Sequence, residues 1–324
     1  MKRTVAAVWV AAAVLMLSAC EPIDEGGGAG VDGPLTFTNG YVFVRGNSGD
    51  VFLVNEVDPN VTQQLSTPTT NGARHPALSR DGRQVVYARL TGTASELVRV
   101  GTAEGSVPTV VLGAAATGGQ NLRNPVFSPA GNFIVFVYDI GTTSFLGLVN
   151  VDGTGFTQLA GNAGRSYGAP FFVTSASSGT AVLAPAGPSR SELTQLDQVT
   201  LSPRSVLTLS NNLTSTDGQL TVVGRVVQSP DGQRLAFDAR AGLGATRIYV
   251  AAFSGTVVQP ADRLTSLTEG QETLPTWVGN ARVGFSSSAG GNDNVYTASA
   301  TVLRGSATLV VPSARDPWFG GPGL

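Results

Sequence analysis

The chain has 324 residues, a formal net charge of −2, 13% charged residues, 41 glycines and a single cysteine. It is long enough for one large domain or two small ones, and its glycines suit short strands joined by tight turns, where positive φ angles are needed. Because the chain has no net positive charge, no overall basic field would recruit nucleic acid, and no nucleic-acid partner is expected.

The first residues have the features of a bacterial export signal. Lys2 and Arg3 form a charged start, and residues 5–17 form an apolar run that is too short to span a membrane comfortably. The segment ends in Leu-Ser-Ala-Cys at residues 17–20. This ending resembles the lipobox of bacterial lipoproteins, and the alternative is an ordinary secretory signal with an incidental cysteine.

The lipobox resemblance implies that residues 1–19 are a signal peptide and that Cys20 is lipidated. Cys20 is the only cysteine, so its thiol would be consumed by the lipid and the mature chain would have no disulfide. Several acyl chains hold a protein to a membrane far better than one does. Glu21 follows the cysteine, where an aspartate would favour retention in the inner membrane. We therefore expect a cell-envelope protein anchored in the outer membrane and facing the periplasm.

Residues 20–34 are rich in glycine and acidic side chains and have no apolar periodicity. Such a segment is typical of a flexible tether between an anchor and a folded body. The remaining residues, 35–324, contain short apolar stretches bounded by Gly, Pro, Asn, Asp and Ser. Because none of these stretches sustains helical spacing, the body is predicted to be all-β.

A repeat runs through this body. Each copy of the repeat is aligned on one residue of its first strand, which we call the frame start: residues 76, 125, 170, 226 and 275. The first strand is a Pro-x-aromatic or similar stretch, and three further strands follow it. Their spacing fits one four-stranded propeller blade per copy. In chain order the expected strands are 41–45, 51–57 and 62–65; 75–79, 84–89, 96–100 and 109–112; 124–128, 133–138, 145–151 and 156–159; 169–172, 180–183, 193–199 and 205–209; 222–228, 235–239, 247–253 and 263–267; 274–277, 283–286, 294–298 and 307–311; and 315–319.

The two ends of the body complement each other. Residues 315–319 form a first strand with nothing after it, and residues 41–65 supply three strands with no first strand before them. Pairing them would complete a sixth blade and hide the two sheet edges. Apolar side chains two residues past each frame start should then pack between blades: Leu78, Phe127, Phe172, Trp277 and Phe319, with Gln228 as a mismatch. The copy that forms the fourth blade, at about residues 167–209, has lost its turn signature and should be the least regular.

The copy that forms the fifth blade, with its frame start at residue 226, resembles a known family. It reads Ser-Pro-Asp-Gly-x-x-Leu-Ala-Phe at residues 229–237, with Ile-Tyr-Val at 248–250 and Arg-Leu-Thr at 263–265. This pattern is similar to the TolB-type propeller repeat, and the similarity covers most of residues 40–319. The resemblance implies a six-bladed β-propeller of the Gram-negative periplasm, although the same repeat also occurs in propeller domains of oligopeptidases. Asp81 and Asp231 are expected to cap hairpin turns rather than to carry chemistry.

Little in the chain indicates catalysis or metal binding. His75 is the only histidine, and Gly-Arg-Ser-Tyr-Gly at 164–168 lacks the strand-to-helix context of a nucleophile elbow. One histidine and one lipidated cysteine are too few ligands for a zinc or copper site. We therefore expect no cofactor, no metal and no enzyme activity. A hydrolase or lyase that uses channel carboxylates such as Asp316 is the less favoured alternative.

The candidate site lies just before each frame start, where the chain enters the innermost strand at the mouth of the channel. Four of the six blades offer arginine there: the pairs include Arg74/His75, Arg123/Asn124, Gly224/Arg225 and Arg315/Asp316. Converging arginines would form a positive funnel for a carboxylate or phosphate. The favoured alternative is structural, because ion pairs also gather at such seams between blades.

These observations lead to a functional hypothesis. We expect a monomeric, lipid-anchored scaffold that binds an envelope protein or peptide, possibly an acidic one, through the channel mouth. The alternative is a binding module for a small ligand such as a glycan or a peptidoglycan fragment.

Overall fold

The computed structural model describes residues 31–32, 35–46, 49–66, 72–162, 164–173 and 181–321. Cys20 and the predicted signal peptide lie outside the described residues. No helix in the described part of the chain is long and apolar enough to cross a membrane.

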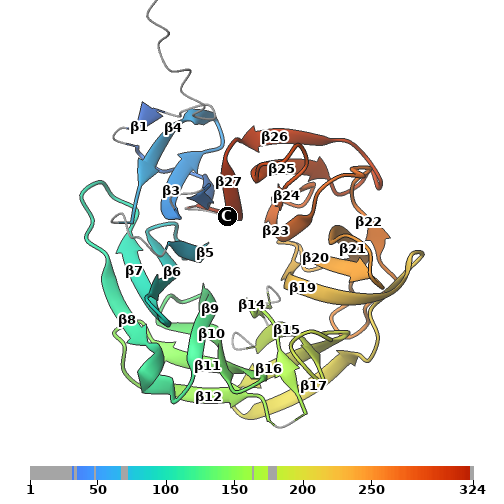
Figure 1. Cartoon of the computed structure of the whole chain (residues 1–324), viewed down its shortest axis with the longest axis horizontal. Coiled ribbons are helices and arrows are strands. Elements are labelled where there is room, and N and C mark those ends of the chain that lie inside the picture. The colour runs from blue at the N-terminus through green and yellow to red at the C-terminus, as the bar shows by residue number, and fades with distance from the viewer. Residues whose placement is uncertain are drawn as a thin grey trace, which may run out of the picture.

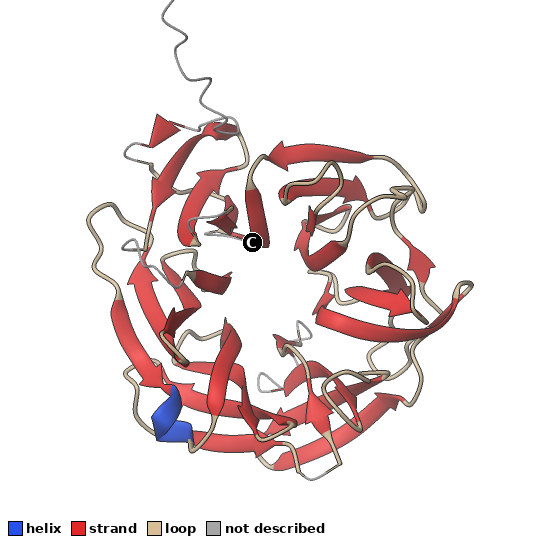
Figure 2. Ribbon diagram, viewed as in Figure 1, coloured by secondary structure: helices blue, strands red, loops and turns tan. Residues whose placement is uncertain are grey.

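Six small antiparallel sheets stand around a central axis, as Figure 1 shows. Apart from one short 3₁₀ helix, η1 (Ala114–Thr117), every regular element in the described ranges is a strand (Figure 2). The prediction of an all-β, six-bladed propeller is confirmed. The blade strands are β2 (Gly40–Arg45), β3 (Asp50–Asn55) and β4 (Asp58–Gln64); β5 (Ala73–Leu78), β6 (Gln84–Thr91), β7 (Ala94–Gly101) and β8 (Thr109–Gly113); β9 (Gln120–Phe127), β10 (Phe133–Ile140), β11 (Thr143–Asn150) and β12 (Thr157–Ala160); β13 (Ser166–Tyr167), β14 (Phe171–Phe172), β15 (Ala181–Gly187), β16 (Gln195–Leu201) and β17 (Arg204–Ser210); β18 (Thr214–Ser215), β19 (Gly218–Gln228), β20 (Arg234–Ala241), β21 (Arg247–Ala252) and β22 (Asp262–Arg263); and β23 (Glu272–Val278), β24 (Arg282–Ser287), β25 (Asn294–Ser299) and β26 (Ala307–Val311).

The ring closes as the two incomplete ends of the repeat predicted. The last strand, β27 (Ala314–Gly320), pairs antiparallel with β2, so that Trp318 lies opposite Val42 and Phe319 lies opposite Tyr41. This places the C-terminal strand innermost in the first blade, beside the N-terminal strands (Figure 1). Closure pairs two strand edges that would otherwise be open to association with other chains.

The hairpin turn between the first and second strands is built by side chains that the repeat places at fixed positions. In the fifth blade the Ser229 hydroxyl donates to Asp231 Oδ1 at 2.5 Å, and Asp231 Oδ1 accepts the Gln233 N–H at 3.0 Å. Gly232 adopts φ of 74°, which a side chain would disfavour. Ser79 and Asp81 make the same bonds in the second blade. The prediction that these aspartates cap turns is confirmed.

The blades share apolar faces, as their size requires. The side chains predicted to pack between blades, namely Leu78, Phe127, Phe172, Trp277 and Phe319, are all buried, with exposed fractions of 5–8%. The mismatched Gln228 is also buried, and its side-chain amide donates to the Gly232 carbonyl at 2.9 Å. It therefore fastens the turn of its own blade where the other copies carry an apolar side chain.

The fourth blade is irregular at its inner edge. Its first strand is divided into β13 and β14, and both pieces pair with β15. Gly168 lies between them and its N–H donates to the Pro185 carbonyl at 2.8 Å. A side chain at this position would meet Pro185 and Leu193 at less than 3 Å, so glycine allows the strand to bend here. The next residues, Ala169 and Pro170, line the channel beside this bend.

One short strand lies within the segment predicted to be a tether. β1 (Val31–Asp32) pairs in parallel with β4, with Val31 opposite Val61. The outer edge of the first blade is therefore extended by residues that precede the expected start of the propeller.

Candidate functional site

The innermost strands share a bulge at the residue before the frame start. His75, Asn124, Leu274 and Asp316 all have positive φ, between 49° and 55°, and the strand register shifts at this point in each of their blades. A left-handed conformation costs a residue other than glycine roughly 1–2 kcal/mol. Because the same bulge recurs at the same position in four blades, it is a regular part of the inner strand and not a local irregularity.

The backbone N–H groups of three of these bulges donate hydrogen bonds to side chains of a neighbouring blade. Asp316 Oδ2 accepts the His75 N–H at 3.0 Å, and the Ser286 hydroxyl accepts the Asp316 N–H at 2.9 Å. Asp238 Oδ2 accepts the Leu274 N–H at 3.0 Å, while its other oxygen accepts the Arg225 N–H at 2.6 Å. Burial raises the pKa of the Asp238 carboxyl, although these hydrogen bonds oppose the rise. Asp316 and Asp238 therefore act as links between blades.

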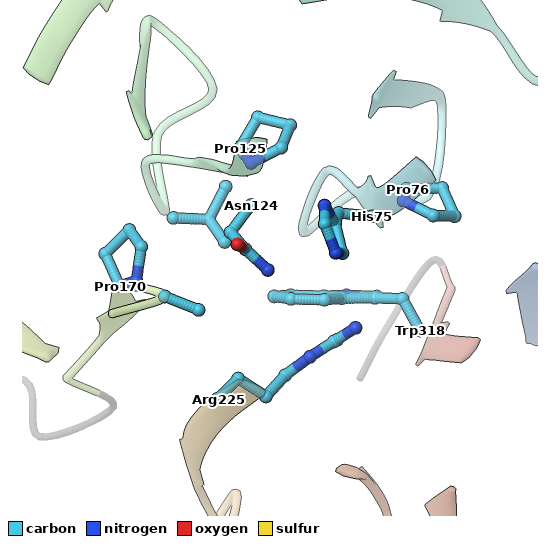
Figure 3. Close-up of a pocket in the computed structure, with 9 residues that line it drawn as sticks. His75, Pro76, Asn124, Pro125, Pro170, Arg225 and Trp318 are labelled. Carbon is cyan, nitrogen blue, oxygen red and sulfur yellow. The ribbon is translucent and has the colours of Figure 1, made fainter. Parts of the chain in front are cut away.

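Trp318 fills a space on the inner wall of the ring. Figure 3 shows its ring lying between His75 on one side and the Arg225 guanidinium on the other. The Arg225 guanidinium carbon is 5.3 Å from the centre of the ring, a cation–π geometry, and Arg225 also donates to the Pro317 carbonyl at 3.3 Å. Only about 10 Å³ remains free among these side chains. This space is therefore too small to hold a peptide.

Arg225 does not face the mouth. Its exposed fraction is 3%, and burial lowers its pKa to about 10, while Asp316 and Asp238 act in the opposite direction. The sequence placed Arg225 in a possible positive funnel. In the structure its guanidinium packs beneath the Trp318 ring.

A cavity of about 270 Å³ lies next to this space. It is formed by the second to fifth blades, near β5, β9 and β19 as labelled in Figure 1. More than half of its lining residues have polar or charged side chains, and the others are small or apolar. The lining residues are His75, Asn121, Arg123, Asn124, Asp139, Tyr167, Gly168, Ala169, Arg190, Leu193, Val223 and Gly224.

Asp139, at the end of β10, is the centre of a polar network in this cavity. Its carboxylate accepts hydrogen bonds from Asn121 Nδ2 at 2.7 Å, Arg123 Nη1 at 2.8 Å and the Ser144 hydroxyl at 2.7 Å. Arg123 also donates to the Ser144 hydroxyl, at 2.8 Å. The pKa of Asp139 is lowered: burial alone would raise it, and Arg123 and the three hydrogen bonds outweigh burial. Arg123 is thus held in place by residues of its own blade, whereas the structural alternative expected ion pairs at the seams between blades.

Arg74 reaches the same network from the second blade. Its Nη2 donates to Asn121 Oδ1 at 2.5 Å, and Asn121 in turn donates to Asp139. Burial and the nearby Arg123 lower the pKa of Arg74, while Asp316 and Asp139 oppose this effect. Arg74 and Arg123 therefore meet at Asn121, which Arg74 contacts through its side chain and Arg123 through its backbone carbonyl.

Arg190 reaches Asp139 from the fourth blade. It lies in the connection between β15 and β16, and its Nη1 is 3.1 Å from Asp139 Oδ2. Its side chain is 49% exposed, whereas that of Arg123 is 16% exposed. Arg190 is therefore the cation of the cavity that is most accessible to a ligand.

His75 contributes a neutral ring. Burial lowers the pKa of His75 to about 3; Asp316 opposes this fall, and the nearby arginines reinforce it. Its Nδ1 has no hydrogen-bond partner within the described ranges. Near neutral pH the cavity is consequently lined by two cations, Arg123 and Arg190, and one anion, Asp139.

The structure thus divides the predicted site residues. His75, Arg123 and Asn124 line the cavity, and Arg74 is joined to it through Asn121. Arg225, Arg315 and Asp316 are not among its lining residues; Arg315 Nη1 is 3.4 Å from Asp316 Oδ2.

Sequence reasoning missed Asp139 and Arg190. Asp139 ends an apolar second strand, which is a detectable signal. Arg190 lies in an irregular connection of the degenerate fourth blade and had no such signal.

Within the described ranges no three His, Cys, Asp or Glu side chains form a group that could hold a metal ion. Ser166, from the discarded nucleophile motif, is 1% exposed, and its hydroxyl accepts the Ser144 N–H at 3.3 Å.

Comparison with known proteins supports the fold. No protein-family model matches the chain, and no curated protein matches its sequence. Among solved structures, TolB from Acinetobacter baumannii is similar with a TM-score of 0.66 at 15% identity, over 89% of this chain and 68% of that one. A putative TolB from Agrobacterium tumefaciens gives 0.57 at 14% identity, over 88% and 91%. An oligogalacturonate lyase in complex with manganese gives 0.53 at 14% identity, over 78% and 72%. The chain therefore has a TolB-like propeller fold, which it shares with at least one enzyme.

Proposed function

We propose that this protein is a non-catalytic, lipid-anchored propeller of the cell envelope that binds a protein or peptide at its channel mouth. The observation that carries the proposal is the 270 Å³ cavity, into which polar side chains of neighbouring blades converge. A well-formed cavity with convergent polar groups is the usual candidate for a ligand site. The TolB-like fold and the lipobox ending at Cys20 support the envelope location, the first by analogy of fold.

The charge of the cavity favours an acidic partner. Arg123 and Arg190 outnumber Asp139 in the lining, and Arg74 lies one hydrogen bond away. Arginine side chains are suited to bind carboxylates through paired hydrogen bonds. An acidic segment of an envelope protein fits this arrangement.

A small ligand, such as a glycan or a peptidoglycan fragment, is the second candidate. The observation that favours it is the adjoining space, where Trp318 and Arg225 leave only about 10 Å³ free. A cavity of this size with no room on that side holds a small molecule better than it admits a long chain.

The non-catalytic assignment rests on how the acidic groups are used. Asp316 is 6% exposed and holds the His75 N–H, while Asp139 is bound by two arginines, an amide and a hydroxyl. Neither carboxylate is left available as a general acid or base in the way that a hydrolase or lyase requires.

Filling the cavity should abolish binding while leaving the fold intact. Val223 lines the cavity and is 48% exposed, so Val223→Trp should block the site at little cost in stability. Val206 on β17 is 49% exposed and lies outside the cavity, which makes Val206→Trp the matched control. The tagged proteins would be isolated from the envelope with their partners. We expect a partner retained by Val206→Trp and lost with Val223→Trp; retention by both variants would contradict the proposal.

The small-ligand alternative has its own readout in the same variants. A glycan or muropeptide at one hundred times its Kd should stabilise the native protein by about 2.7 kcal/mol. A rise in Tm with Val206→Trp but not with Val223→Trp would favour this candidate over a protein partner.

The lipid anchor is tested separately. Cys20→Ser removes the proposed acceptor, so the protein should lose incorporation of labelled fatty acid and leave the membrane fraction. Serine preserves the size of the side chain, so export should continue. A variant that stays labelled and membrane-bound would contradict anchoring through Cys20.

A further inference from the structure

Arg190 differs from the other cations of the cavity in how little holds it. Among the described residues its single hydrogen bond goes to Asp139, and half of its side chain is exposed. Arg123, by contrast, donates to the Asn121 carbonyl, to Asp139 and to Ser144. Most of the N–H groups of Arg190 are therefore available to a ligand.

Asp139 does not depend on Arg190. With Arg190 turned away, its buried carboxylate would still accept hydrogen bonds from Asn121, Arg123 and Ser144. A half-exposed ion pair adds little to stability. Exchange of Arg190 from Asp139 to a ligand anion is therefore inexpensive, and it leaves no buried charge unpaired.

One buried polar atom of the cavity lining has no partner among the described residues. His75 Nδ1 makes no hydrogen bond there, and His75 lines the cavity beside Trp318 (Figure 3). Buried polar groups are normally satisfied, so this nitrogen is placed to meet a polar ligand that also pairs with Arg190.

We propose that Arg190 binds the C-terminal carboxylate of a peptide, whose last residues occupy the cavity against Tyr167, Leu193 and Val223. This inference rests on the proposed function, because it requires the cavity to be the binding site. It adds the chemical identity of the group that is recognised.

The end of a chain fits the cavity better than its middle. Trp318 and Arg225 leave only about 10 Å³ free in the adjoining space, so an entering peptide has no room to continue in that direction. The 270 Å³ of the cavity equals the liquid volume of about nine water molecules, which suits roughly the last one or two residues of a peptide.

The sign and size of the charge select the carboxyl end. An N-terminal ammonium would meet Arg123 and Arg190 and be repelled. Asp139 already offsets one of the two arginines, so the lining carries one uncompensated positive charge. That charge matches a carboxylate rather than a phosphate, which carries up to two negative charges.

The experiment uses the isolated full-length protein and fluorescent mixed-sequence tetrapeptides labelled at their N-termini. One library has free C-terminal carboxylates, a second has C-terminal amides and no acidic residues, and a third has C-terminal amides with Asp or Glu inside. Fluorescence polarisation should show the free acids binding at least about tenfold more tightly than either amide library, because a charged hydrogen bond is lost. Arg190→Gln should remove this preference and Arg190→Lys should keep part of it.

Arg204→Gln is the matched control. Arg204 is an exposed arginine of the same blade that bonds to Thr157 and the Gln158 carbonyl on the outer side, so the preference for acids should persist. Equal binding of acids and neutral amides, or an acid preference that survives Arg190→Gln, would overturn the inference alone. Equal binding of the internal-acid library would assign the carboxylate to an Asp or Glu side chain instead. If no library binds and Val223→Trp also retains the native partner, the proposed function fails as well.

Discussion

Deleting residues 314–324 is expected to abolish cooperative folding. The deletion removes β27, which pairs with β2 and completes the first blade. It also removes Phe319, whose burial is worth about 3–5 kcal/mol by itself, and the Asp316 carboxylate that holds the His75 N–H. A domain with a total stability of about 5–15 kcal/mol cannot absorb these losses together.

Circular dichroism during heating would measure this effect, and gel filtration would report association through the exposed edge of β2. A chain ending at residue 321 keeps the whole of β27 and serves as the control. Phe319→Ala gives an intermediate case, with a lowered Tm but a cooperative transition. An unchanged unfolding curve for the chain that lacks residues 314–324 would contradict the closure of the ring by β27.

Acid should destabilise this protein through its only histidine. Burial lowers the pKa of His75 to about 3, from an ordinary value of 6.5. Below pH 6.5 the unfolded chain therefore takes up a proton that the folded chain refuses, and this contribution to stability is lost progressively as the pH falls toward 3. At about 1.4 kcal/mol for each pH unit, roughly 3 kcal/mol should be lost between pH 7 and pH 4.

His75→Asn isolates this contribution. Asparagine tolerates a positive φ and already occupies the equivalent bulge position in the next blade, as Asn124. The pKa values of three carboxyl groups are also shifted: that of Asp139 is lowered, and burial raises those of Asp238 and Glu272. These groups are present in both proteins, so their contributions cancel when the variant is compared with the wild type. Urea unfolding at pH 7 and pH 4 should show the variant losing less stability than the wild type. Parallel losses in the two proteins would rule out His75 as the source.

Much of the architecture could be predicted because each blade repeats the same local signals. The strand boundaries expected from period-two patterning and turn residues agree to within two residues with those of β10, β11 and β12 in the third blade, whereas β9 begins four residues before the expected start. The turn at Ser229–Asp231 uses only neighbouring residues, so its hydrogen bonds follow directly from the order of the side chains.

The site was predicted only in part. The frame position pointed to His75, Arg123 and Asn124, and these three residues line one cavity. It could not show that Arg225 turns beneath Trp318, because that contact joins residues 93 positions apart in the chain. Nor could it show Arg190 reaching Asp139 across 51 positions, from a blade with a weak repeat.

The sequence by itself determined the all-β class, the six blades, the closing strand and the turn chemistry, because local periodicity and turn residues control each of these. Only the tertiary structure decided which polar side chains meet. The bulges at His75 and Asn124 lie at one cavity that four blades line, and Trp318 fills the space beside it. Such convergence depends on the packing of residues that are distant in the chain, and no pattern within a single repeat records it.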